Sequence, residues 1–190
     1  HATKVGMLAS AAIVSAVSHA IERHHLTNVV VDPVMIAKSG ARLLDEAAVE
    51  AVRTQLLPRA TVVTPNVFEA EALTGRRIAT LEDQRAAAKA LADLGPRAVL
   101  VKGGHLDGPA VDVLYDGRDL IELRAERIVS MHTHGTGCTL SSAIAARLAL
   151  GDDPIAASRA AKAYVTRAIA QAPGLGHGHG PLQHFPRRTE

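Results

Sequence analysis

The chain contains one cysteine, Cys138, among its 190 residues. A single thiol cannot form an internal disulfide, and a zinc site would need more sulfur ligands or a clearer histidine spacing than this sequence has. His177 and His179 in "GHGHG" have too few partners for a metal site, so we interpret that stretch as a flexible loop.

Long apolar runs and blocks of like charge are also missing. No apolar run reaches the roughly 18 to 20 residues that span a membrane, and the first residues lack the order of a secretory signal. The 21 basic residues are interspersed with 19 acidic ones, which argues against binding nucleic acid. We therefore predict a cytoplasmic protein that binds neither membrane nor nucleic acid. Its 47% hydrophobic content predicts a single domain over residues 1–190.

Lysine is scarce, because only five of the 21 basic residues are lysines. A lysine in such a chain is a weak hint of a site that needs a compact point charge. Lys102 stands between an apolar run and a glycine pair, and Lys162 lies in the last helical segment. A lysine on a solvated helix face, such as Lys89, needs no special explanation.

Three short apolar runs rich in β-branched residues predict buried parallel strands over 29–32, 61–64 and 98–102. Alanine-rich segments with helical periodicity predict helices over 11–23, 45–57, 67–73 and 81–94. Strands that alternate with helices form right-handed βαβ units. The predicted fold class is therefore α/β, with a mostly parallel central sheet flanked by helices.

The segment "VDVLYDGRDLIELRAERI" interrupts the alternation. Its Asp116-Gly117 pair separates two strand-like runs, which predicts an antiparallel hairpin at one edge of the sheet. Two more helices are predicted over 137–150 and 154–171, before a glycine-rich tail. Because an edge hairpin can pair between subunits, we predict a homodimer.

Ligands of open α/β sheets bind at the carboxyl ends of the strands. The predicted strands end in "DPVMIAKSG", "TPNVFEAE" and "KGGH", and this topology would bring all three polar clusters to one edge. The turn "HGTGC" is a candidate fourth member. We therefore expect the functional residues in these four segments.

The turn that holds the cysteine opens a helix with an apolar stripe. Gly135 and Gly137 let the backbone approach a ligand closely, and the N–H groups of the first helical turn form an anion site that also favours a thiolate. A small buried hydrophobic residue after an ordinary glycine turn explains Cys138 about equally well. The spacing fits neither the Walker phosphate loop nor the dinucleotide fingerprint.

In order and spacing, the segments "VVVDPVMIAKSG", "VVTPNVFEAEAL", "AVLVKGGH" and "HTHGTGCTLSSAIAA" resemble the hydroxymethylpyrimidine/phosphomethylpyrimidine kinases of thiamine biosynthesis, in the ribokinase-like superfamily. The resemblance runs from "TKVGML" to "GHGHGP", nearly the whole chain. It implies a ribokinase-like fold. It also implies ATP- and Mg²⁺-dependent phosphorylation of 4-amino-5-hydroxymethyl-2-methylpyrimidine and of its monophosphate.

The resemblance implies that Gly135, Thr136, Gly137 and Cys138 form an anion hole for the transferred phosphoryl group. Cys138 stands at the catalytic-base position, where most ribokinase-like enzymes carry aspartate. It would take the proton of the hydroxymethyl group or orient that hydroxyl. We hypothesise that a thiol replaces a carboxylate because a fixed negative charge would repel a substrate that is already phosphorylated.

Further roles follow from the same resemblance. Lys102 and Lys162 would contact ATP, although a lysine extended into solvent is the plain alternative for each. Asp32 and Glu69 would hold Mg²⁺, and Asn66 would supply a neutral oxygen or a water contact. Asn66 also fits a helix N-cap, and Asp32 also fits the cap of a turn.

Met7, Val34 and Met35 lie in segments that line the pyrimidine pocket in the family, although methionines at strand ends are more often core residues. Residues 38–40, Lys-Ser-Gly, would close over phosphates or form a plain surface turn.

The chain departs from the family pattern at its start. The family begins with a strand and a glycine-rich segment, whereas this sequence starts at "HATKVGML". We therefore expect the domain to lack that strand and segment, which would expose strand edges. Two alternatives stay open: a pyridoxal kinase-type activity, since a fold does not fix the substrate, and a truncated, inactive nucleotide-binding module.

Overall fold

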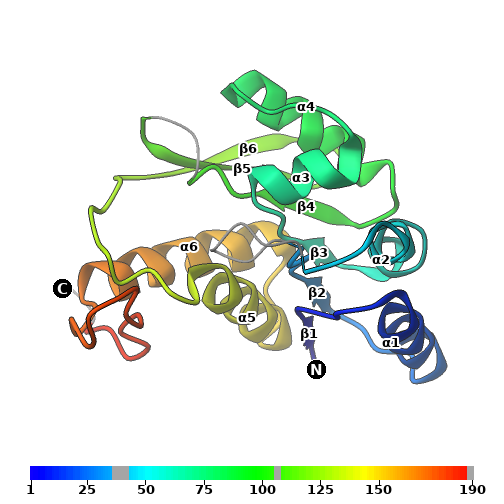
Figure 1. Cartoon of the computed structure of the whole chain (residues 1–190), viewed down its shortest axis with the longest axis horizontal. Coiled ribbons are helices and arrows are strands. Elements are labelled where there is room, and N and C mark those ends of the chain that lie inside the picture. Colours follow the sequence, from blue (N-terminus) through cyan, green and yellow to red (C-terminus); the bar gives the residue numbers. More distant parts are fainter. Residues whose placement is uncertain (36–42, 105–107, 188–190) are drawn as a thin grey trace.

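The computed structural model describes residues 1–35, 43–104 and 108–187. One sheet of six strands has the order β1-β2-β3-β4-β5-β6, so that consecutive strands are neighbours (Figure 1). The strands are β1 (Thr3–Val5), β2 (Val29–Val31), β3 (Val62–Val63), β4 (Ala98–Val101), β5 (Ala110–Tyr115) and β6 (Leu120–Ala125). The first four are parallel, and β5 and β6 are antiparallel to their neighbours. The predicted α/β class with an antiparallel edge hairpin is confirmed.

Helices cover both faces of this sheet (Figure 1). Side chains alternate along a strand, so Val29 and Val31 of β2 join one core cluster and Val30 joins the other. The first cluster packs against α1 (Ala11–Arg23), α2 (Glu46–Ala51), α3 (Val67–Thr74) and α4 (Leu81–Ala92). The second packs against α5 (Thr136–Ala149) and α6 (Pro154–Ala170). None of the helices in the described parts of the chain is long and apolar enough to cross a membrane.

The helix predicted over 45–57 is wrong in its second half. After α2 the chain widens into a π-helical turn, Val52–Leu56, and then tightens into a 3₁₀ turn, Leu57–Arg59. The N–H of Leu57 donates to the carbonyl of Val52, five residues back. Pro58 has no N–H and its ring clashes with the preceding turn, so a regular helix cannot continue through it.

Strand β1 was not predicted. Its three residues are too few to show an alternating pattern, and it is recognised only by its pairing with β2, from Thr3 beside Val29 to Val5 beside Val31. The predicted strands over 29–32, 61–64 and 98–102 each end one residue earlier in the structure. Asp32, Thr64 and Lys102 are therefore the first residues after β2, β3 and β4, at one edge of the sheet.

The hairpin turn forms where the sequence predicts it. The side-chain oxygen of Asp116 accepts hydrogen bonds from the N–H groups of Arg118 and Asp119, at 2.9 and 2.7 Å. Gly117 has a φ of +93°, which only glycine adopts without strain. Local side-chain and backbone preferences therefore fix the end of the sheet.

Candidate functional site

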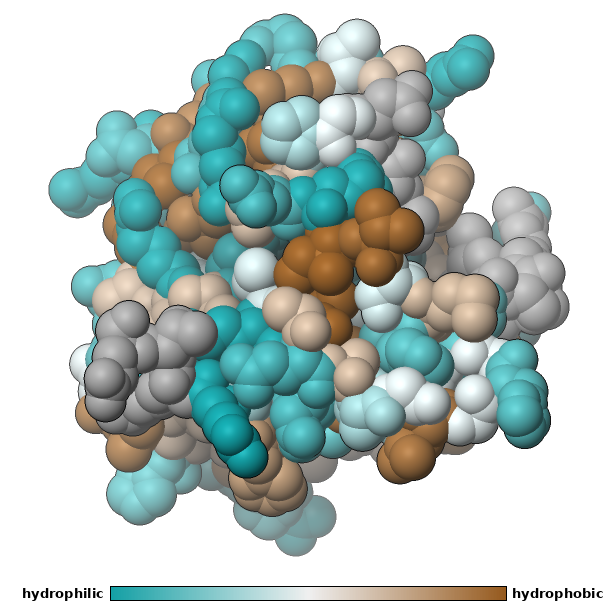
Figure 2. Space-filling model, turned by 90° about the vertical axis from the view of Figure 1, so that its left-hand side faces the viewer, coloured by the Kyte–Doolittle hydropathy of each residue, from teal (hydrophilic) through white to brown (hydrophobic). Residues whose placement is uncertain are grey.

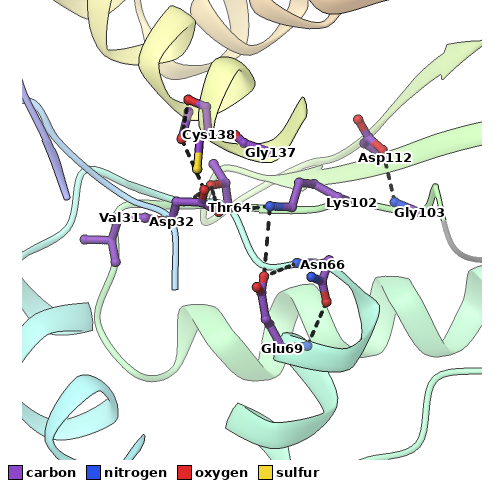
Figure 3. Close-up of polar contacts among 11 residues, drawn as sticks. Val31, Asp32, Thr64, Asn66, Glu69, Lys102, Gly103, Asp112, Gly137 and Cys138 are labelled. Atoms are coloured by element: carbon purple, nitrogen blue, oxygen red, sulfur yellow. Dashed lines mark hydrogen bonds and ion pairs between the residues drawn. The ribbon is translucent and has the colours of Figure 1, made fainter. Parts of the chain in front are cut away.

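Asp32 is the centre of a polar cluster at the carboxyl edge of the sheet. Its Oδ1 lies 2.9 Å from Nζ of Lys102 and 3.3 Å from Oγ1 of Thr64 (Figure 3). Asp32 is only 1% exposed, and the Lys102 side chain is 15% exposed. A buried carboxylate is stable only when cations or donors compensate its charge, so Lys102 and Asp32 hold each other in place.

Glu69 lies on the other side of Lys102. Its Oε2 is 3.9 Å from Nζ of Lys102 and accepts the N–H of Asn66 at 2.7 Å, while the N–H of Glu69 donates to Oδ1 of Asn66 at 2.9 Å. These reciprocal bonds form a capping box at the start of α3. The predicted N-cap role of Asn66 is thus confirmed. Burial raises the pKa of Glu69 above its ordinary value, and the nearby Lys102 ammonium opposes this.

The raised pKa of Glu69 predicts an unusual stability effect. The folded-state pKa of Glu69 lies above the ordinary value of 4.5, so the protonated carboxyl favours the folded state. This stabilisation is complete below pH 4.5 and is lost as the pH rises through the folded-state pKa. Glu69→Gln keeps an oxygen for the Asn66 N–H. In magnesium-free buffer we therefore expect a higher melting temperature than the parent at mildly alkaline pH, and no difference below pH 4.5.

Glu46→Gln is the matched control, since Glu46 is an exposed acidic residue in the first turn of α2. It should lower the melting temperature slightly at alkaline pH, because a negative charge favours a helix N-terminus. A melting-temperature difference between Glu69→Gln and the parent that does not change with pH would contradict the prediction.

The glycine turn meets this cluster from the opposite face of the sheet. Gly135 is the N-cap of α5 and has a φ of +80°. A Cβ atom on Gly137 would lie 3.1 Å from Nζ of Lys102 and 3.8 Å from Oδ2 of Asp32, so the backbone of the turn approaches the ion pair closely. The first intrahelical bond runs from the N–H of Thr139 to the carbonyl of Gly135, at 2.8 Å. The N–H groups of Gly137 and Cys138 precede it and have no intrahelical acceptor.

Cys138 is exposed and lies in the first turn of α5, above Asp32 (Figure 3). The alternative of a small buried hydrophobic residue at this position is therefore wrong. Thr136 closes the turn, since its Oγ1 donates to the carbonyl of Thr133 at 2.8 Å. The roles of the four turn residues in catalysis stay predictions, but the structure brings Gly137 and Cys138 to the Lys102 and Asp32 pair.

A second charged cluster holds Lys162. Its Nζ lies 2.7 Å from Oδ2 of Asp112 and donates to the carbonyl of Ala110 at 3.2 Å. Oδ1 of Asp112 accepts the N–H of Gly103 at 3.0 Å. A Cβ on Gly103 would lie 1.9 Å from the carbonyl oxygen of Val111, so only glycine fits there. Asp112 thus connects Lys162 to the turn that follows Lys102.

Sequence reasoning missed Asp112. The sequence did carry a signal, because an acidic residue stands inside the apolar run "VDVLY". In the structure Asp112 is only 4% exposed. Acidic residues are rarely buried without a charged partner. Lys162 also lines a groove of about 410 Å³ between β6 and α6, and its side chain is 15% exposed.

Asp112→Asn should separate the two contacts of this side chain. The amide oxygen can still accept the Gly103 N–H, whereas the partly buried Lys162 ammonium loses its counter-charge. We expect the free energy of unfolding to fall by about 1 to 3 kcal/mol. Urea unfolding measures this effect.

Asp116→Asn is the control, because Asp116 caps the hairpin turn and forms no ion pair within the described ranges of the chain. It should change the stability by less than about 1 kcal/mol. If Asp112→Asn costs as much stability in a Lys162→Met background as in the parent, the two side chains are not coupled.

The residues predicted to contact the pyrimidine are spread over several environments. Met35 is 2% exposed and belongs to the core cluster of α1 to α4, Val34 is half-buried, and Met7 is 50% exposed. Their contact with a substrate stays a prediction. Residues 38–40 lie outside the described residues. In the described part of the chain, no group of three or more His, Cys, Asp and Glu side chains could hold a metal ion.

The glycine-rich tail lies against the segment that leads into the glycine turn. The N–H of His134 donates to the carbonyl of Gly180 at 3.2 Å, and Nδ1 of His179 lies 3.2 Å from the carbonyl of Met131. Val129 and Met131 in this segment are 98% and 66% exposed. The face at the left of Figure 1, where this segment runs, carries a hydrophobic patch among hydrophilic side chains (Figure 2).

Two features of the structure together indicate the class of protein. Helices cover both faces of a mostly parallel sheet, and the carboxyl edge of that sheet brings a lysine and buried carboxylates to the N-terminus of a helix. This combination is typical of ribokinase-like phosphotransferases, and solved structures of that class match the chain closely. An ADP complex of Bacillus subtilis pyridoxal kinase matches with a TM-score of 0.89 and 41% identity, over 96% of this chain and 69% of that one.

The family is narrower than this class. The family model for phosphomethylpyrimidine kinase matches residues 1–183. The hydroxymethylpyrimidine/phosphomethylpyrimidine kinase of Streptomyces coelicolor is 51% identical over 183 residues, 96% of this chain and 68% of that protein. The thiamine biosynthesis bifunctional protein ThiED of Geobacter sulfurreducens is 50% identical over 96% of this chain, which spans 37% of it. The chain belongs to the phosphomethylpyrimidine kinase family, as its four motifs predict.

Proposed function

We propose that this chain transfers the γ-phosphoryl group of ATP to the hydroxymethyl group of 4-amino-5-hydroxymethyl-2-methylpyrimidine, and then phosphorylates the resulting monophosphate. One observation carries the proposal. The backbone of Gly137 lies so close to Lys102 and Asp32 that an added Cβ would be 3.1 Å from the ammonium. The first turn of a helix and a cation therefore lie side by side, an arrangement that suits a phosphoryl group.

In the proposed reaction the chain mainly positions groups and compensates charge, as phosphoryl transfer requires. Lys102 would leave Asp32 to contact the phosphates of ATP, and Lys162 would contact them from the Asp112 cluster. The N–H groups at the start of α5 would stabilise the charge on the transferred group. Cys138, exposed at the same point, would take the proton of the acceptor hydroxyl or orient it for in-line attack.

The donor set fits Mg²⁺. Asp32 and Glu69 offer the hard carboxylate oxygens that this ion prefers, and both lie near Nζ of Lys102, at 2.9 and 3.9 Å. Magnesium usually keeps several waters, so one or two carboxylates beside the phosphates suffice. Bound there, the ion would neutralise charge on the phosphate oxygens. Asn66 would keep its place at the N-cap of α3 and hold Glu69 in position.

An ADP-release assay tests the proposal on this chain. ATP is supplied with the hydroxymethylpyrimidine, with its monophosphate or with pyridoxal as the acceptor, and turnover is expected with the first two. Cys138→Ala, purified in the same way, is the comparison protein, because its expected loss of activity separates the turnover of this chain from that of contaminating kinases. Turnover with pyridoxal alone would favour the pyridoxal kinase alternative, which the similarity to the Bacillus subtilis structure supports.

The non-enzyme alternative gives a different result in the same experiment. ATP binding measured by calorimetry, without turnover on any of the three acceptors, would identify the chain as a nucleotide-binding module and overturn the proposal.

The same preparation tests the predicted homodimer by light scattering. A dimer that Leu120→Arg on the edge strand β6 dissociates would support pairing through the hairpin.

A further inference from the structure

Ser141 lies one turn after Cys138 on α5, and it is fully buried beneath the glycine turn. Its Oγ is 3.4 Å from Oδ2 of Asp32, 3.1 Å from the carbonyl of Gly137 and 3.1 Å from the carbonyl of Cys138. Ser141 is not among the residues that the sequence assigned to the site. It nevertheless contacts both the phosphate-binding turn and the carboxylate that holds Lys102.

A serine hydroxyl has one hydrogen, so Ser141 can donate to only one of these three oxygens at a time. While Lys102 neutralises Asp32, the hydroxyl can bond the carbonyls of its own helix. When Lys102 turns to a phosphate and Asp32 takes up its proposed role toward Mg²⁺, the carboxylate loses the ion pair that orients it, and hydrogen-bond donors must hold it in place. Ser141 is then the donor on the Oδ2 side, and Thr64 is the donor on the Oδ1 side.

We propose that Ser141 is a positioning residue, which fixes the orientation of Asp32 and couples it to the N-terminal turn of α5. The inference rests on the proposed phosphoryl transfer, because it concerns how the site keeps its geometry once Lys102 has moved. It assigns no contact between Ser141 and any substrate. Its effect passes through Asp32 to Lys102, and through the Gly137 and Cys138 carbonyls to the anion hole.

Ser141→Ala tests the proposal, with Ser158→Ala as the matched control. Ser158 is also a buried serine in a helix on the same face of the sheet, but its hydroxyl has no hydrogen-bond partner among the described residues. For Ser141→Ala we expect kcat to fall about tenfold to a hundredfold, as for the loss of a hydrogen bond to a charged group. The KM for ATP should rise, the KM for the pyrimidine should stay unchanged, and Ser141→Thr should recover most of the activity.

A purely structural role would lower the folded fraction, and so kcat, without moving the KM for ATP. Equal kinetic constants for Ser141→Ala and Ser158→Ala would therefore overturn the inference. Thermal unfolding of both variants shows how much of any loss comes from stability.

A measurement that requires no catalysis tests the inference independently of the proposed function. Cys138 is the only cysteine and is exposed, so a thiol reagent reports on this turn alone. We expect Ser141→Ala to react faster than the parent, by about threefold or more, because the first turn of α5 loses an anchor. An unchanged rate, equal to that of Ser158→Ala, would contradict the inference even if the parent turned over none of the acceptors.

Discussion

Replacing Lys102 with methionine is expected to lower kcat/KM for ATP by roughly 100-fold to 1,000-fold. Methionine keeps the length of the side chain but removes the only cation within contact distance of Asp32 among the described residues. The site then loses its point charge for the phosphates. Initial rates at varied ATP concentration measure the effect.

Two further variants show whether this loss is specific to Lys102 and whether a positive charge alone restores the activity. Lys89→Met removes an exposed lysine on α4 and should leave the kinetic constants unchanged. Lys102→Arg keeps the charge, but its guanidinium group is larger than the ammonium that lies close to the Gly137 backbone, so it should recover only a small part of the activity. If Lys102→Met retains the activity of the Lys89 variant, Lys102 merely balances the charge of Asp32.

Stability distinguishes the two roles of Lys102. Without its ammonium, the buried Asp32 carboxylate keeps only hydroxyl donors, so the free energy of unfolding of Lys102→Met should fall by about 1 to 3 kcal/mol. Urea unfolding of the same variant measures this. An activity loss without a loss of stability would mean that Asp32 and Lys102 are weakly coupled in the free protein.

Replacing Cys138 with alanine is expected to lower kcat by roughly 100-fold to 10,000-fold, the range for loss of a general base. The change leaves the backbone N–H groups of the glycine turn in place, so the KM for ATP should change much less. Because the thiol is exposed, its removal creates no cavity, and the melting temperature should stay near that of the parent. Single-turnover kinetics with the hydroxymethylpyrimidine measure the chemical step.

Cys138→Asp tests why a thiol stands at this position. A fixed carboxylate should retain more activity on the neutral hydroxymethylpyrimidine than on its monophosphate, because like charges repel in a site of low dielectric. Cys138→Ser is the neutral control and should affect both substrates equally. Equal losses on both substrates for Cys138→Asp would contradict the charge hypothesis, and full activity of Cys138→Ala would exclude the thiol as the base.

The elements that the sequence predicts well are those whose signal is local. Helix α1 spans the predicted range, because its apolar periodicity is clear and Ser10 caps its first turn. The hairpin around Asp116 is likewise encoded by its own turn residues. The π-helical turn before Pro58 and the three-residue strand β1 escaped prediction, since the first is a small distortion of a helical pattern and the second exists only through its neighbour.

For the candidate site, the sequence by itself determined which residues stand at the strand ends and which glycines allow a close backbone approach. These follow from local periodicity and from the conformational freedom of glycine. Only the tertiary structure decided the partners: Lys102 pairs with Asp32 across 70 residues, Lys162 with Asp112 across 50, and Ser141 reaches Asp32 across 109. A buried charge pairs with whichever donor or counter-charge the packed sheet and helices bring within contact distance. The sequence around each residue does not indicate which distant residue that will be.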